Sequence, residues 1–148
     1  IDAGQFIRPH NIAIDHNDNV YVVDREAHRI QIFDSSGNFL TMWSNIHRPD
    51  AMVLWKDHIY IGELNGMTGM EGAPGLGHRV SIYDLAGNLV SRFGDKNEGS
   101  GPGQFHAPHG IAVDSEGSIY VSEVSYTITG SRIDPPRVLR SISKYKLA

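Results

Sequence analysis

An internal repeat constrains the fold of this 148-residue chain more than any other feature of its sequence. Three units align with one another, and each begins with a proline, a polar residue and an apolar run. The matching segments are residues 9–15, 19–24, 28–34 and 37–40 in the first unit, 49–54, 58–63, 78–84 and 87–90 in the second, and 108–114, 118–123 and 139–145 in the third. A repeat of this length is typical of solenoids and propellers.

The residues within each unit favour short strands. Val, Ile, Tyr and Phe are concentrated in the matching segments, and turn-forming residues such as Gly37 and Asn38 separate them. The alternation of Ile30 and Ile32 with Gln31 is typical of a half-buried strand. We therefore predict four antiparallel strands in each unit, which is the pattern of a β-propeller blade. Two long connections, residues 64–77 and 124–138, are rich in Gly or contain Pro-Pro and are predicted to be loops.

The predicted fold is all-β, with residues 1–148 forming one propeller segment. Its three blades are expected at about residues 4–46, 47–98 and 99–148. Closed propellers typically have four to eight blades, so three blades correspond to half of a six-bladed ring. We expect either that two copies of the chain close the ring as a homodimer or that the chain is a fragment of a longer propeller.

The composition argues against several classes of protein. The chain has 13 Lys and Arg against 17 Asp and Glu, a formal net charge of −4, so nucleic acid is not an expected partner. No apolar run approaches the length of a membrane span, and a membrane partner is not expected either. The absence of cysteine excludes disulfides and thiolate metal sites. The first residues do not read as a signal peptide. We expect a soluble protein, and processing of a secreted or periplasmic precursor stays open.

The repeated motif resembles a known family. Pro-His-x-Ile-Ala-apolar-Asp, then Tyr-Val-x-Asp/Glu, then His-Arg-Ile-x-Ile-Phe-Asp resembles the NHL repeats of β-propellers. Over the whole chain the likeness is greatest to the C-terminal half of peptidyl-α-hydroxyglycine α-amidating lyases and their bacterial relatives. Residues 23–33, VDREAHRIQIF, are similar to a segment that follows a zinc-binding Pro-His in that family.

Three candidate metal ligands occupy the same position in the three units: His10, Asp50 and His109. In a propeller this position begins the innermost strand, so the side chain can face the central channel. Imidazole and carboxylate groups bind zinc or harder cations. The resemblance implies that His10 and His109 are two of three zinc-binding histidines from alternate blades. Asp50 is a candidate contact for calcium, and each histidine could instead bind a loop carbonyl and cap its strand.

Two further residues are candidates for contact with substrate. The resemblance implies that Arg25 binds a substrate carboxylate, a role that suits the forked guanidinium group. The alternative is an ordinary ion pair with Asp24 or Glu26. Tyr126, in the long connection of the third unit (residues 124–138), is a candidate proton donor or acceptor.

Other recurrent residues are expected to be structural. We predict that a repeated His-Arg pair joins successive blades and that the acids ending the second segment of each unit bind the arginines. These residues are His28, Arg29, His78 and Arg79, together with Asp24, Glu63 and Glu123.

The resemblance implies a reaction. Zinc would polarise the α-hydroxyl of a small-molecule or peptide substrate, a peptidyl-α-hydroxyglycine, and cleavage of the C–N bond would release an amide and glyoxylate. The chain departs from the family at Ala107, where the family has methionine, and at Gly110, where it has a calcium-linked aspartate. The alternatives are a propeller hydrolase acting on a lactone or ester, and a non-catalytic module that binds protein or glycan through the face lined by residues 64–77.

Overall fold

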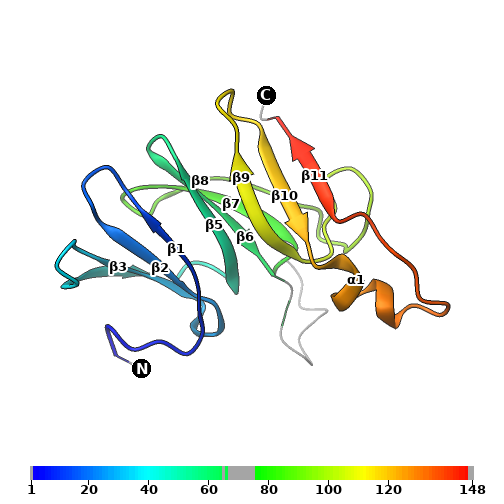
Figure 1. Ribbon diagram of the computed structural model, residues 1–148, viewed down its shortest axis with the longest axis horizontal. Helices are drawn as coiled ribbons and strands as arrows, with labels where there is room; N and C mark the ends of the chain where they lie inside the picture. Colours follow the sequence, from blue (N-terminus) through cyan, green and yellow to red (C-terminus); the bar gives the residue numbers. More distant parts are fainter. Residues whose placement is uncertain (1, 65, 67–75, 147–148) are drawn as a thin grey trace.

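The computed structural model describes residues 2–64, 66 and 76–146, which form three antiparallel sheets arranged side by side (Figure 1). We call the sheets blades 1, 2 and 3 in chain order. Blade 1 contains β1 (Pro9–Ile14), β2 (Val20–Asp24), β3 (Arg29–Phe33) and β4 (Phe39–Trp43). Blade 2 contains β5 (Pro49–Trp55), β6 (His58–Glu63), β7 (Arg79–Asp84) and β8 (Leu89–Phe93). Blade 3 contains β9 (Pro108–Val113), β10 (Ile119–Glu123) and β11 (Ile142–Tyr145).

Within each blade the strands pair in chain order, which confirms the predicted all-β propeller architecture. Blades 1 and 2 have the predicted four strands, and three strands of blade 3 lie within the described residues. The described part of blade 3 has three strands, because β11 ends at Tyr145 and only Lys146 of the following residues is described. The outer edge of β11 therefore has no neighbouring strand among the described residues.

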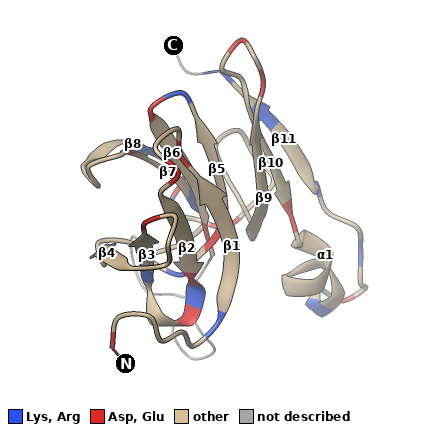
Figure 2. Ribbon diagram, turned by 60° about the vertical axis from the view of Figure 1, so that its left-hand side comes forward, with Lys and Arg blue, Asp and Glu red and all other residues tan. Residues whose placement is uncertain are grey.

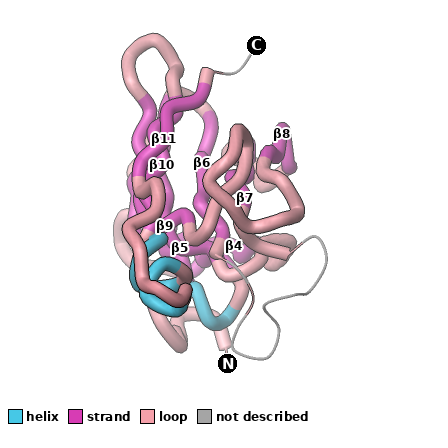
Figure 3. The backbone as a smooth tube through the Cα atoms, turned by 90° about the vertical axis from the view of Figure 1, so that its right-hand side faces the viewer, coloured by secondary structure: helices cyan, strands magenta, loops and turns pink. Residues whose placement is uncertain are grey.

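Residues 124–138 contain short helical turns where a loop was predicted. These are α1 (Ser125–Ile128) and η2 (Gly130–Arg132), and they lie in cyan at the end of blade 3 opposite the C-terminus (Figure 3). The turn forms ahead of the Pro-Pro pair, where nothing blocks the hydrogen bond from the Ile128 N–H to the Val124 carbonyl. A further turn, η1 (Arg25–Ala27), follows β2. Most of the predicted loop at residues 64–77 lies outside the described residues.

Aspartates shape four of the hairpins. In each, the Oδ1 atom accepts the backbone N–H groups two and four residues further on, at 2.8–3.0 Å. The four residues are Asp15, Asp34, Asp84 and Asp114. In such Asx-type turns the aspartate side chain binds the backbone that follows it and so stabilises the tight turn between two strands. The backbone N–H of Ser118, foremost among several such donors, lowers the pKa of Asp114 to about 2.

The apolar core lies between the blades in two clusters. One joins blades 1 and 2 and includes Tyr21, Ile30 and Ile59; the other joins blades 2 and 3 and includes Val80 and Phe105. Charged residues lie mainly at the strand ends and in the loops, so most of each strand is uncharged (Figure 2). No helix among the described residues has the length and apolar character needed to cross a membrane.

The first strands of the three blades lie next to one another, since β5 contacts both β1 and β9 (Figure 1). Close approach is helped by Gly62, where an added Cβ would lie 3.2 Å from the Cβ of Pro108. The beginnings of β1, β5 and β9 consequently meet at one end of the molecule, which we call the mouth.

Candidate metal centre

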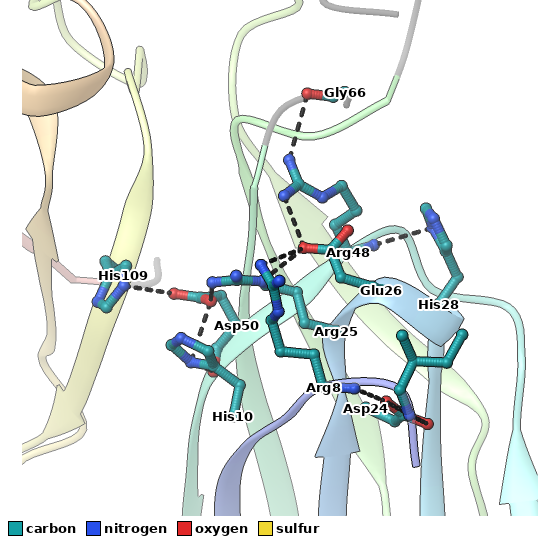
Figure 4. Close-up of polar contacts among 11 residues, drawn as sticks. Arg8, His10, Asp24, Arg25, Glu26, His28, Arg48, Asp50, Gly66 and His109 are labelled. Atoms are coloured by element: carbon teal, nitrogen blue, oxygen red, sulfur yellow. Dashed lines mark hydrogen bonds and ion pairs between the residues drawn. The ribbon is translucent and has the colours of Figure 1, made fainter. Parts of the chain in front are cut away.

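The mouth brings together His10, Asp50 and His109, one from each blade (Figure 4). One ligand atom of each residue lies within 4.8 Å of those of the other two. The two imidazole rings are 5.1 Å apart between centroids and nearly perpendicular, at 84°. The side chain of Asp50 is completely buried, whereas those of His10 and His109 are 25% and 40% exposed. The cluster therefore has a buried anionic base and two imidazoles that solvent can reach.

Each of the three residues is the extra residue of a β-bulge. The strand registers skip from Pro9 to Asn11 and from Pro49 to Ala51, and in blade 3 from Pro108 to Gly110. A bulge leaves its extra residue out of the ladder and changes the direction of its side chain. Proline, which cannot donate to a ladder, precedes the bulged residue in all three blades. This repeated irregularity is what turns the three side chains toward one point.

Asp50 is the centre of the cluster. Its Oδ1 atom accepts a hydrogen bond from Arg25 Nη1 at 2.7 Å and lies 3.0 Å from His10 Nδ1. Its Oδ2 atom is buried and has no hydrogen-bond partner among the described residues, and His109 Nε2 lies 3.4 Å away. Buried carboxylate oxygens are normally paired, so this atom is the unusual feature of the site.

The donor set fits a zinc ion. The separation of His109 Nε2 and Asp50 Oδ2, 3.4 Å, is that of two tetrahedral ligands about 2.1 Å from one zinc, and the three ligand atoms of the cluster as a whole lie within 4.8 Å of one another. Two imidazoles and one carboxylate are ordinary zinc ligands. Calcium, which takes six to eight oxygen ligands, fits less well, because the cluster among the described residues contains a single carboxylate.

Arg25 lies beside the cluster in η1, and its side chain is 12% exposed. It bonds Asp50 and, through Nε at 3.0 Å, Glu26, whereas the alternative partner Asp24 binds Arg29 instead. Neither hydrogen bond of Arg25 uses Nη2. Burial lowers the pKa of Arg25, but hydrogen bonds and charges from Asp50 and Glu26 outweigh burial and raise it overall. The guanidinium is thus a fixed cation at the mouth.

A second layer of charge surrounds Arg25, which the sequence pattern did not reveal. Arg48 Nη2 lies 2.9 Å from Glu26 Oε1, and Arg8 Nη1 lies 3.9 Å from the same oxygen (Figure 4). Burial by itself raises the pKa of Glu26. The hydrogen bonds and charges of Arg48 and Arg25 lower it by more than that, so the pKa is lowered overall. Three arginines thus surround the single carboxylate of Glu26, and the rim next to Asp50 is positively charged.

Tyr126 lies on α1, which follows the end of β10. The side chain is 47% exposed and its ring lies beside Gly130, where an added Cβ would be 3.3 Å from it.

The recurrent residues have the predicted structural contacts. His28 Nδ1 accepts the N–H of Arg48 at 3.3 Å, and His78 Nδ1 lies 2.8 Å from the carbonyl of His106, so both join successive blades. The predicted acid–arginine pairs form in the first two blades, between Asp24 and Arg29 at 3.2 Å and between Glu63 and Arg79 at 2.7 Å.

Comparison with known proteins agrees with this architecture. The NHL repeat family model matches residues 6–33, which include β1, β2 and β3. The chain is 30% identical over 121 residues to the protein brain tumor of Drosophila melanogaster, covering 81% of this chain and 11% of that protein. It is 24% identical over 125 residues to a probable peptidyl-α-hydroxyglycine α-amidating lyase of Caenorhabditis elegans, covering 75% of this chain and 32% of that protein.

Solved structures share the fold. A protein of unknown function from Bacteroides caccae superposes with a TM-score of 0.67 at 10% sequence identity, covering 90% of this chain and 43% of that one. The chain thus spans between about a tenth and less than half of the length of these proteins. Repeated sequence, blade topology and the family match agree: the chain is built of NHL repeats that fold as consecutive blades of a β-propeller.

Proposed function

We propose that this chain supplies a metal-dependent ligand-binding mouth to an NHL-repeat propeller. One observation carries the proposal: the buried Oδ2 atom of Asp50 lacks a hydrogen bond among the described residues, and the side chains of His10 and His109 lie beside it. An unpaired buried carboxylate oxygen costs free energy that a bound cation would recover. Zinc suits this donor set.

The ligand class follows from the charge around the cluster. Arg25 is fixed beside Asp50, and a guanidinium group can bind both oxygens of a carboxylate or phosphate. Arg8 and Arg48 add positive charge at the same rim. We therefore propose a small molecule or peptide with a carboxylate group as the ligand, bound by the metal and by Arg25.

Binding without catalysis is the interpretation that the comparisons favour. The identity is higher to the protein brain tumor, at 30%, than to the probable lyase, at 24%.

A lyase activity is the second candidate, and a specific arrangement favours it. His10 and His109 stand in register two blades apart with Arg25 close by, as the resemblance to amidating lyases implies. Bound zinc would supply a Lewis acid for the substrate hydroxyl. Arg25 would hold the substrate carboxylate, and Asp50 would fix the position of Arg25.

Zinc titration of the purified chain tests the first proposal. We expect one zinc per chain, and a loss of affinity greater than about 100-fold in His109→Ala, since even the outer partners of zinc ligands are worth 10- to 100-fold. His16→Ala is the matched control, because the His16 side chain is 61% exposed and lies outside the cluster. Unchanged affinity in His109→Ala would reject the site.

Glyoxylate release from a peptidyl-α-hydroxyglycine separates the two candidates. Zinc binding with no glyoxylate supports the binding module. Zinc-dependent glyoxylate that is lost in Arg25→Met supports the lyase, with Arg132→Met as the control because Arg132 lies in η2 of the third unit, whereas Arg25 lies in η1 of the first.

A further inference from the structure

Three positions in blade 3 repeat a polar group of blade 2. The strand registers are the same, since the third strand pairs with the second in corresponding positions of both blades. The equivalent residues are Glu63 and Glu123, Ser81 and Ser143, and Tyr83 and Tyr145.

In blade 2 an arginine of the fourth strand binds all three groups. Arg92 of β8 donates from Nε to Ser81 Oγ at 2.7 Å and from Nη2 to the Tyr83 hydroxyl at 3.1 Å. The same Nη2 lies 3.5 Å from Glu63 Oε1. Arg92 stands directly opposite Ser81 in the ladder between β7 and β8. The fourth strand therefore delivers one cation to a buried acid and two hydroxyls.

In blade 3 the equivalent atoms are buried without a partner. Glu123 Oε1, Ser143 Oγ and the Tyr145 hydroxyl have no hydrogen bond to any described residue. Arg140 does not replace Arg92, because its Nη2 is 4.0 Å from Glu123 Oε1 and its Nη1 and Nη2 atoms donate to loop carbonyls such as that of Gln104, at 2.7 Å. The three atoms of blade 3 that lack a hydrogen-bond partner are thus the counterparts of the three atoms that Arg92 contacts in blade 2.

The surroundings of these atoms are open. A cleft of about 720 Å³ lies along the edge of β11 and is lined by Phe93, Arg140, Ser143, Lys144 and Tyr145. A strand laid along β11 would occupy this cleft.

Blade 1 provides an internal control. Its third strand has Gln31 and Phe33 where blade 2 has the serine and tyrosine. Its fourth strand has Met42 at the position of the arginine. Within this chain the arginine accompanies the two hydroxyls and is absent where they are absent.

We propose that the edge of β11 binds an extended segment from outside residues 1–148 that carries an arginine opposite Ser143. The segment pairs antiparallel with β11, since an exposed strand edge offers unpaired N–H and C=O groups. Its arginine binds Glu123, Ser143 and Tyr145 as Arg92 binds their counterparts. The inference is independent of the metal proposal, because β11 lies outside the cluster at the mouth.

A peptide with the sequence of residues 87–94, GNLVSRFG, serves as the probe, because it is the fourth strand of blade 2. The control peptide has methionine in place of arginine, as blade 1 does. Titration into the zinc-free chain, followed by amide chemical shifts, gives both the affinity and the place of binding. We expect the arginine peptide to bind at least about tenfold more tightly, since hydrogen bonds to charged groups are the strong ones, with shifts along β11.

The double variant Ser143→Ala/Tyr145→Phe tests the specificity. It removes two unpaired hydroxyls and leaves the strand edge intact, so both peptides should still bind while the preference for arginine falls to less than about threefold. Ser131→Ala is the control, because Ser131 lies in η2, away from β11. Equal binding of the two peptides to the unaltered chain, no binding of either, shifts away from β11, or self-association of the chain through β11 would each overturn the proposal.

Discussion

Blades 2 and 3 carry the same acid, serine and tyrosine at equivalent positions, and they differ in how these groups are satisfied. Glu63 of blade 2 accepts hydrogen bonds from Arg79, from the backbone N–H of His47 and from Ser81. Within the part of the chain that the structure describes, Glu123 of blade 3 accepts hydrogen bonds only from the backbone N–H groups of residues 106 and 107, both on the same oxygen. A repeated sequence therefore does not guarantee a repeated environment, because a blade is completed by residues that another strand must bring.

The largest expected difference between the blades concerns the two acids. Glu63→Gln should lower the free energy of unfolding by about 3–5 kcal/mol, since it removes the buried carboxylate charge that forms an ion pair with Arg79, whose side chain is only 14% exposed. Glu123→Gln should cost about 1 kcal/mol, because the backbone N–H groups can still bind the amide oxygen. Urea unfolding measures both. Equal losses would show that the two acids have the same role.

Arg92→Met tests the fourth strand directly. The variant gives blade 2 the residue that blade 1 has at this position, but it removes the donor for Ser81 and Tyr83. We expect the free energy of unfolding to fall by about 2 kcal/mol, because these are hydrogen bonds from a charged group. Met42→Leu in blade 1 is the control and should cost less than about 1.5 kcal/mol. A neutral Arg92→Met would remove the basis for the inference about β11.

The hydroxyl groups should respond in opposite ways in the two blades. Tyr83→Phe removes hydrogen bonds to the Asn45 carbonyl at 2.6 Å and to Arg92, and should cost about 1 kcal/mol. Tyr145→Phe removes a buried hydroxyl with no hydrogen bond to the described residues, and should leave stability within about 0.5 kcal/mol or raise it. Thermal or urea unfolding of both variants decides the matter. A clear loss in Tyr145→Phe would mean that the hydroxyl has a partner.

The smallest effect is expected at the hairpin of Asp114. Its pKa is lowered to about 2, first by the backbone N–H of Ser118. A lowered pKa in the folded state means that the ionised group adds stability above its unfolded pKa, near 3.8, and that this stability is lost as the pH falls toward 2. Asp114→Asn should therefore have a lower free energy of unfolding than the unaltered chain at pH 7. The difference between the two free energies should shrink as the pH falls and should vanish near pH 2. A difference that stays constant across that range would contradict this origin.

The repeat in the sequence predicted the blades, their order and the position at which His10, Asp50 and His109 begin their strands. It could not predict the contact of Arg25 with Asp50, because these residues belong to different blades and meet only when the blades pack. The β-bulges could not be predicted from the sequence either, because a bulge is defined by the register with the partner strand. Arg92 lies in a strand that reads as solvent-exposed, so its role depends on the serine and tyrosine of the strand beside it. The metal and the substrate stay predictions.

The pairing of His10 with His109 has a consequence for how the molecule unfolds. In repeat proteins each unit usually touches only its neighbours, and stability is then a sum of local terms. Here the rings of the first and third blades stand 5.1 Å apart across the second. An ion held between them would tie together two units that share little else, so that loosening either terminal blade would release the ion, and saturating concentrations of the ion would make the three blades melt as one cooperative block.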